Sequence, residues 1–291
     1  AHLASIAGFP PGVFNVIIGK DASAMGKVLC ESEKVKKISF TGSTRVGHLL
    51  MSQSASTLKK LSLELGGNAP FIVFEDANID KAVEGTIVSK FRNSGQTCVC
   101  VNRIIVHEKI YEQFSQKLKK AISKLKVGNG MEEEVNIGPL INKDALKKVN
   151  DFVEDAILKG GEVLLGGKRI GECFFEPTLI SNANLEMNFS KEEIFGPIIP
   201  LYKFSNDEEA IQMANNTVYG LASYFFSENV TRCWRVAEAL EYGMVGINEG
   251  LISTELAPFG GIKFSGQGRE GSKYGMDDYL DIKYMCFGNI I

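Results

Sequence analysis

The feature that most constrains the fold is a regular alternation of short apolar segments with longer amphipathic ones. The short segments are typical of buried strands, and the longer ones carry apolar residues at helical spacing. The expected strands are 35–40, 58–64, 70–74, 103–107, 163–165, 174–180, 198–204, 221–226 and 244–248. The expected helices are 44–54, 79–92, 110–125, 143–158, 208–215 and 230–240. This alternation predicts an α/β fold with one or two mainly parallel sheets, covered by helices on both faces.

Composition narrows the class of protein. With 291 residues, 44% of them hydrophobic and 23% charged, the chain can bury a large core in one large or two ordinary domains. The net charge of −3 and the lack of a basic block disfavour nucleic acid as a partner. No apolar run approaches the roughly 20 residues that cross a bilayer, so no membrane partner is expected.

Six dispersed cysteines fit a reducing compartment better than a disulfide framework. Cys98 and Cys100 form a C-x-C pair that could bind a metal. No second Cys or His pair stands at ligand spacing, so no metal site is expected.

Two residues carry most of the functional information, namely Cys98 and Glu64. A thiol can form a covalent intermediate with a carbonyl carbon, and a carboxylate can activate the water that releases it. Glu64 ends an apolar segment, where burial would raise its pKa into the range useful for a base. Gly95 and Thr97 predict a tight turn whose backbone amides would help to hold an oxyanion.

Each of these residues also has a plainer interpretation. A buried, inert thiol is common for any Cys, and Glu64 would serve equally as a salt-bridged structural residue. A Cys–His protease is disfavoured because the three histidines are scattered, although they need only meet Cys98 in space.

Three further segments have two interpretations each. The segment 42–47 follows a strand and opens a helix, where backbone N–H groups could hold a phosphate, or it is an ordinary capped turn. Glu193 and Phe195 belong either to a site or to a solvated acidic turn followed by a core Phe. Arg92 either complements the end of a helix or presents its guanidinium to a substrate carboxylate.

Five ordered motifs resemble the aldehyde dehydrogenase superfamily. They are FTGS at 40–43, LELGG at 63–67, GQTC at 95–98, EEIFGP at 192–197 and PFGG at 258–261. Within it, segments 91–100, 245–253 and 268–275 are most similar to succinate-semialdehyde dehydrogenases. The resemblance implies NAD- or NADP-dependent oxidation of succinate semialdehyde to succinate, as in 4-aminobutyrate degradation. Cys98 would form a thiohemiacetal and then a thioester, and Glu64 would activate water.

The resemblance also implies roles for other residues. The expected cofactor-binding residues are Gly42, Ser43, Gly47, Leu65, Glu193 and Phe195. Arg92 and Ser253 would bind the substrate carboxylate, and Cys98 with Cys100 would form a reversible, inactivating disulfide, a redox switch.

The family fold begins well before Ala1, so the chain is expected to be truncated and inactive alone. We expect a partial dinucleotide-binding domain at 1–67, a complete catalytic α/β domain at 68–272 and an oligomerisation tail at 273–291. The tail segment 279–287 alternates like an edge or exchanged strand. Resemblance implies a homo-oligomer, dimer or tetramer, in the mitochondrial matrix, with the cytoplasm as the alternative. Two other hypotheses stay open, a dehydrogenase for another aldehyde and a non-catalytic fragment or pseudoenzyme.

Overall fold

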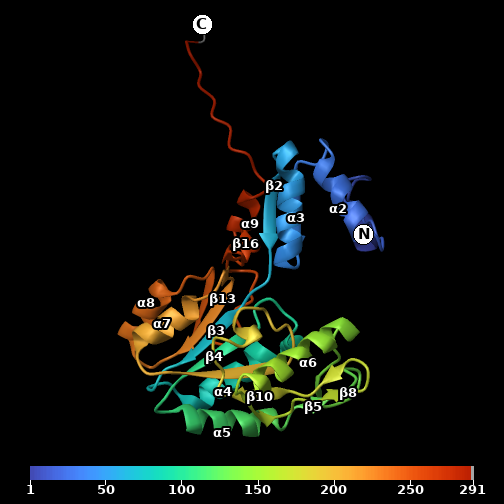
Figure 1. The fold of residues 1–291 in the computed structure, drawn as a ribbon. Helices are drawn as coiled ribbons and strands as arrows, with labels where there is room; N and C mark the ends of the chain where they lie inside the picture. The colour runs from blue at the N-terminus through green and yellow to red at the C-terminus, as the bar shows by residue number, and fades with distance from the viewer. Residues whose placement is uncertain (290–291) are drawn as a thin grey trace.

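A seven-stranded sheet forms the centre of the structure, a computed structural model that describes residues 1–289 (Figure 1). In spatial order its strands are β14 (Met244–Ile247), β13 (Ala222–Phe226), β3 (Ala69–Val73), β4 (Val101–His107), β11 (Ile198–Phe204), β10 (Thr178–Ser181) and β7 (Glu162–Leu165). Neighbouring strands are parallel except for β7, which runs antiparallel to β10. The predicted α/β class with a mainly parallel sheet is therefore confirmed.

Helices bury both faces of this sheet. Phe71 and Val73 of β3 belong to one apolar cluster together with residues of α4 (Ile79–Phe91) and α5 (Tyr111–Ile122). Ile72, between them, belongs to the opposite cluster, which α6 (Lys143–Leu158), α7 (Asp207–Asn215) and α8 (Val230–Ala239) complete. Burial on both faces explains why β3, and Ile104 to Val106 of β4, form continuous apolar runs rather than alternating ones.

A smaller sheet stands apart from the large one, above it in Figure 1. It contains β1 (Lys37–Thr41), β2 (Lys60–Glu64) and β16 (Gly266–Gln267), with β1 parallel and β16 antiparallel to β2. The helices α2 (Ala22–Glu31) and α3 (Thr44–Ser54) lie beside it. β16 comes from the segment that we assigned to the catalytic domain, so the chain returns to its first sheet near its end.

The remaining elements are short. They are α1 (His2–Ile6), α9 (Tyr274–Asp277), β5 (Lys126–Val127), β6 (Val135–Ile137), β8 (Arg169–Ile170), β9 (Phe174–Phe175), β12 (Tyr219–Gly220), β15 (Ile262–Lys263) and three single 3-10 turns at Ala55–Thr57, Arg92–Gly95 and Asn188–Ser190. The single strand expected at 174–180 is wrong, because Pro177 divides it. A proline has no N–H for a ladder, so β9 pairs with β8 and β10 joins the large sheet.

The predicted strand at 279–287 does not form within this chain. The segment has no regular structure. Its first residues, 279–281, contact Lys37 and Lys60 of the small sheet, and the rest extends away from the body of the chain (Figure 1). Its apolar side chains are exposed, with Ile282 and Tyr284 almost entirely so. An edge strand needs a neighbouring strand, and within residues 1–289 none lies alongside it. Residues 290–291 of the expected tail lie outside the described residues.

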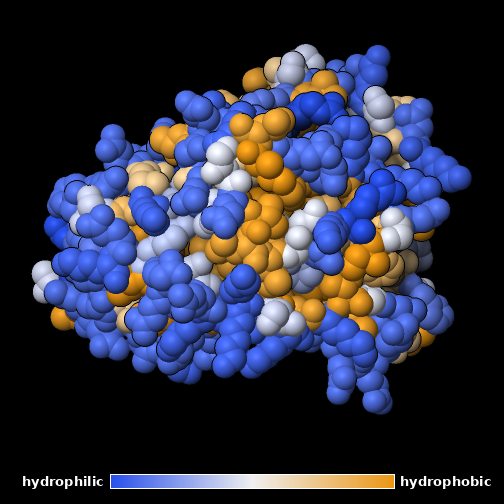
Figure 2. All heavy atoms as spheres, turned by 60° about the horizontal axis from the view of Figure 1, so that its bottom comes forward, coloured by the Kyte–Doolittle hydropathy of each residue, from blue (hydrophilic) through white to orange (hydrophobic). Residues whose placement is uncertain are grey.

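The surface is hydrophilic over much of the face shown in Figure 2, with hydrophobic residues gathered in a patch near its middle. Within residues 1–289, no helix combines the length and apolar character needed to cross a membrane.

Candidate active site

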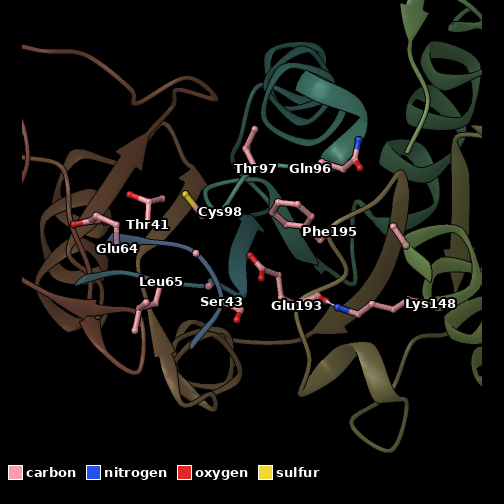
Figure 3. Close-up of a pocket in the computed structure, with 13 residues that line it drawn as sticks. Thr41, Ser43, Glu64, Leu65, Gln96, Thr97, Cys98, Lys148, Glu193 and Phe195 are labelled. Carbon is pink, nitrogen blue, oxygen red and sulfur yellow. Dashed lines mark hydrogen bonds between the residues drawn. The ribbon is translucent and has the colours of Figure 1, made fainter. Parts of the chain in front are cut away.

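A cavity of about 620 Å³ holds both Cys98 and Glu64 (Figure 3). Its walls come from five separate segments, and the lining residues are Thr41, Gly42, Ser43, Glu64, Leu65, Gly66, Gln96, Thr97, Cys98, Ala145, Lys148, Glu193 and Phe195. Glu64 ends β2 of the small sheet, and Cys98 stands just before β4 of the large one. The fold therefore brings a thiol and a carboxyl group from two sheets to one cavity.

The turn before Cys98 has an unusual backbone. Asn93, Ser94 and Gly95 have φ values of 51°, 58° and 78°, in the left-handed region. A Cβ on Gly95 would lie 2.3 Å from the carbonyl oxygen of Gly196. The Asn93 side chain donates to the carbonyl of Gln96 at 3.0 Å. The predicted tight turn is confirmed, and such strain is typical of functional sites.

Two glycines allow the end of β2 to approach the Cys98 turn. A Cβ on Gly67 would lie 2.4 Å from the carbonyl oxygen of Cys98, and one on Gly66 would lie 2.9 Å from Glu193 Oε2. Gly66 and Gly67 thus bring Cys98, Glu64 and Glu193 together from three parts of the sequence.

Burial dominates the electrostatics of Glu64. The residue is 3% exposed, and its Oε2 has no hydrogen-bond partner within residues 1–289. Burial raises the pKa of Glu64 to about 8, and the Glu270 carboxylate adds to this while Arg269 opposes it. Glu64 therefore has the raised pKa that its position in the sequence suggested, suited to a base near neutral pH.

The pKa of Cys98 is raised, whereas the pKa of an activated thiol is lowered. Burial raises the pKa of Cys98 to about 11, and the carboxylates of Glu193 and Glu64 raise it further. The thiol is therefore protonated at neutral pH in this state. A positive charge close to the sulfur would lower this pKa.

Glu193 faces the same cavity. Its Oε1 accepts a hydrogen bond from the Gly67 N–H at 3.1 Å, and its carbonyl accepts one from Lys148 Nζ at 2.7 Å. Burial raises the pKa of Glu193 to about 7, against the opposing effect of the Gly67 N–H. Phe195 is 37% exposed and lines the cavity instead of joining the core. The interpretation as a solvated acidic turn with a core Phe is therefore wrong.

The start of α3 closes another side of the cavity. Gly42 and Ser43 line it, and Ser43 Oγ caps the helix by accepting from the Val46 N–H at 3.4 Å. Gly47 does not line the cavity. The Leu65 side chain packs closely against it, since a Cβ on Gly47 would lie 2.6 Å from that side chain. The helix start can attract a phosphate, and the carboxylate of Glu193 and ring of Phe195 are available to the rest of a dinucleotide. These residues fit NAD or NADP.

Arg92 and Ser253 lie together but outside this cavity. Arg92 Nη1 donates to Ser253 Oγ at 3.4 Å, and both line a cleft of about 530 Å³ with apolar neighbours such as Phe91 and Leu251. Thr97 lines the main cavity and also a small space beside Arg92 and Ser253. The turn that contains Thr97 therefore lies between the Arg92–Ser253 pair and the cavity of Cys98.

Cys100 is buried against the same turn. Its Sγ lies 2.8 Å from Thr97 Oγ1 and donates to the carbonyl of Arg92 at 3.7 Å. All six cysteines are free thiols. In the described part of the chain, His, Cys, Asp and Glu side chains form no group of three or more that could hold a metal.

Lys148 is the lining residue that sequence reasoning missed most clearly. It lies on α6, far from the motifs in sequence, and reaches the cavity beside Ala145, three positions earlier. Only this spacing on one helix face hints at a shared role, and many surface lysines show it.

Comparison with known proteins agrees with this arrangement. Residues 1–285 match the profile of the aldehyde dehydrogenase family. The chain is 58% identical to the mitochondrial succinate-semialdehyde dehydrogenase of Oryza sativa subsp. japonica, over 100% of this chain and 55% of the relative. It is 57% identical to a glutarate-semialdehyde dehydrogenase of Pseudomonas putida, over 98% of this chain and 59% of the relative.

A solved structure is similar throughout the chain. An Escherichia coli NADP-dependent enzyme superposes with a TM-score of 0.98 at 55% identity, covering 99% of this chain and 60% of that one. The chain thus spans 55 to 60% of the length of these relatives.

Proposed function

The chain belongs to the aldehyde dehydrogenase family, and we propose that its whole protein oxidises succinate semialdehyde to succinate with NAD or NADP. The observation that supports this most is the single cavity shared by Cys98 and Glu64. The names of relatives support the substrate, and degradation of 4-aminobutyrate is the process in which we place it.

In the first step, the Cys98 sulfur attacks the aldehyde carbon. A C–S bond forms, the carbonyl oxygen takes up the C=O electron pair, and the proton lost from the Cys98 thiol goes to that oxygen, which gives a thiohemiacetal. When bound, the oxidised nicotinamide supplies a hydride acceptor and a positive charge. Cys98 needs such a charge, because burial and two carboxylates hold its pKa at about 11. Loss of a hydride from the thiohemiacetal carbon and of the hydroxyl proton to solvent would leave a thioester on Cys98.

In the second step, Glu64 takes a proton from a water molecule that attacks the thioester carbon. The C–S bond breaks, succinate leaves, and the sulfur regains a proton. Glu64 has a pKa of about 8, so it can accept that proton and return it to solvent near neutral pH. Because both groups line one cavity, the acyl group need not move between the steps.

Cofactor binding is assigned to other lining residues of the same cavity. We assign the phosphates to Gly42 and Ser43 at the start of α3, the nicotinamide ribose to Glu193 and the ring to Phe195, all lining residues. Gly47 and Leu65 would support the phosphate turn through their mutual packing.

The substrate carboxylate is assigned to Arg92 and Ser253. Succinate semialdehyde and glutarate semialdehyde, named for two relatives, both carry a carboxylate that a guanidinium can bind. Within residues 1–289, the Arg92 guanidinium makes one hydrogen bond, from Nη1 to Ser253 Oγ at 3.4 Å, so most of its N–H groups remain available to a substrate. A dehydrogenase for another aldehyde is the alternative.

The Arg92→Ala variant separates the two candidates. We expect kcat/KM to fall about 10- to 100-fold for succinate semialdehyde, since a charged hydrogen bond is lost, and to change little for a neutral aldehyde such as butanal. Equal losses for both substrates, followed by the absorbance of the reduced cofactor, would favour the alternative.

We also propose that the whole protein is a homo-oligomer, either a dimer or a tetramer. Its proposed location is the mitochondrial matrix, with the cytoplasm as the alternative. The exposed apolar residues after Tyr274 and the name of the rice relative support these statements. The Cys98–Cys100 redox switch is also proposed, supported by two free thiols two positions apart.

A further inference from the structure

We propose that Asn102 is a positioning residue that fixes both peptide groups of Glu193, and so sets where that carboxylate meets the cofactor. The inference rests on the proposed function for its effect on cofactor binding. For its effect on the loop 191–197, which contains Glu193, the inference rests only on the hydrogen bonds of Asn102.

Asn102 grips the chain on both sides of Glu193. Its Oδ1 accepts a hydrogen bond from the Ile194 N–H at 2.7 Å. Its Nδ2 donates to the carbonyl of Glu192 at 3.2 Å and to that of Phe189 at 3.0 Å. The Glu192 carbonyl and the Ile194 N–H belong to the two peptide groups that flank Glu193, so a single side chain holds both.

Only a carboxamide does this from one position. It presents an acceptor and two donors on one rigid plane, whereas Asp offers no donor when ionised and Leu offers neither. Asn102 lies in β4 and is 2% exposed, so its hydrogen bonds are shielded from bulk water. Loss of the amide would remove the side-chain partner of the Ile194 N–H and of the Phe189 carbonyl in a buried region, which is costly. The Glu192 carbonyl would keep the longer hydrogen bond from Asn68 Nδ2, at 3.5 Å.

The loop needs such a clamp because its own structure is irregular. Between the 3-10 turn at Asn188–Ser190 and β11 it forms no helix or strand, and Phe195 has a φ of 52°. No strand ladder therefore fixes Glu193.

Arg103, the next residue of β4, holds the segment that binds the Glu193 carboxylate. Arg103 is 2% exposed, and its Nε donates to Asn68 Oδ1 at 2.7 Å while one Nη2 hydrogen reaches the Asn68 carbonyl at 3.1 Å. Asn68 follows Gly67, whose N–H binds the Glu193 carboxylate. Two adjacent residues of one rigid strand thus hold the backbone of Glu193 and, through Asn68, the segment that holds its side chain.

The first test is amide hydrogen exchange of the Asn102→Ala variant. We expect exchange across 190–196 to be at least about tenfold faster than in the wild type, since buried hydrogen bonds are lost. The matched control is Asn215→Ala, because Asn215 clamps a different loop in the same way, through the Ala239 carbonyl at 2.8 Å and the Glu241 N–H at 2.9 Å. Unchanged exchange at 190–196 in Asn102→Ala would overturn the proposal.

The second test is a double-mutant cycle in the whole protein. We expect Asn102→Ala and Glu193→Ala each to raise the cofactor KM and Kd about 10- to 100-fold, as misplacement of a binding group does. Added to Glu193→Ala, Asn102→Ala should raise them by less than about twofold, because it acts only through Glu193. Asn215→Ala should leave both constants unchanged. Independent, multiplying effects would refute a positioning role.

The two tests separate the inference from the proposed function. If Glu193→Ala leaves cofactor Kd unchanged, the cofactor role of Glu193 fails, and the exchange result still decides whether Asn102 fixes the loop. Should Asn102→Ala not fold, Asn102→Ser retains one small donor and acceptor, and we expect it to show the same pattern to a smaller degree.

Discussion

Three acidic groups share the candidate site, the buried Glu64 and the half-buried Glu193 and Cys98, and their pKa values are all raised. Burial is the largest cause for Glu64, Glu193 and Cys98 alike. Like charges in one low-dielectric cavity oppose each other's ionisation. A site of this kind favours a cationic ligand next to the thiol, which an oxidised nicotinamide would be.

The pH dependence of thioester hydrolysis follows from Glu64. Its carboxylate form, needed to activate water, becomes dominant only above a pH of about 8. We therefore expect the rate after the first turnover to rise between pH 6 and 9, with a midpoint near pH 8, and to level off above, and Glu64→Gln to abolish this rise. A flat profile of the wild-type rate from pH 6 to 9, in steady-state assays, would show that another group is the base.

The free energy of unfolding should also depend on the protonation of Glu64. The pKa of Glu64 is raised from 4.5 to about 8 in the folded state, so its contribution is fully present below pH 4.5 and is lost as the pH rises through about 8. Compared with Glu64→Gln, the wild type should lose free energy of unfolding between pH 5 and 9. Urea unfolding at both pH values measures this, and a constant difference between the two proteins would contradict it.

The residue types at the site were predictable, and some of their surroundings were not. Cys98 and Glu64 stand out in the sequence because each lies beside small residues or ends an apolar run. Lys148 and Asn102 do not stand out, because their roles depend on contacts between residues 45 and 92 positions apart in the chain. Such contacts leave no local pattern.

At the scale of elements, the close approach of β2 to the Cys98 turn depends on a missing side chain. We expect Gly67→Ala to reduce kcat/KM at least about tenfold, because its Cβ would lie 2.4 Å from the Cys98 carbonyl oxygen and shift the turn. Gly130→Ala is the control, since no heavy atom lies within 4 Å of the Cβ position. Equal activity of both variants in the aldehyde assay would show that this approach is unimportant.

Long elements followed from local signals, whereas short ones did not. The helices 44–54 and 143–158 have the predicted bounds, and the Ser43 and Asn142 side chains cap their first turns, which fixes where they begin. β16 has two residues and exists only through pairing with β2, about 200 positions earlier. Periodicity cannot detect a strand of that length.

At the scale of the molecule, the exposed tail predicts assembly. Ile282, Tyr284 and Phe287 are largely exposed and extend from the body of the chain, which is unfavourable unless a partner covers them. Deleting 279–291 from the whole protein should lower its mass in light scattering from that of an oligomer to that of a smaller species. An unchanged oligomer would place the contact elsewhere.

The chain itself spans 55 to 60% of the length of its relatives, and its small sheet has three strands. The proposed phosphate-binding turn follows β1 of this small sheet, so cofactor binding depends on a sheet of only three strands. We therefore expect the 291-residue chain alone to show little or no turnover with succinate semialdehyde and NAD or NADP. Turnover comparable to that of the whole protein would show that this sheet suffices for cofactor binding.

The central claim is that Cys98 carries the acyl group that Glu64 helps to release. Its most direct test is to mix the Glu64→Gln whole protein with succinate semialdehyde and cofactor, quench with acid and determine the mass of the peptide that contains Cys98. The account predicts a succinyl thioester on Cys98 and about one equivalent of reduced cofactor per site, since acylation precedes the step that needs a base. An unmodified Cys98 accompanied by continuing production of succinate would contradict it.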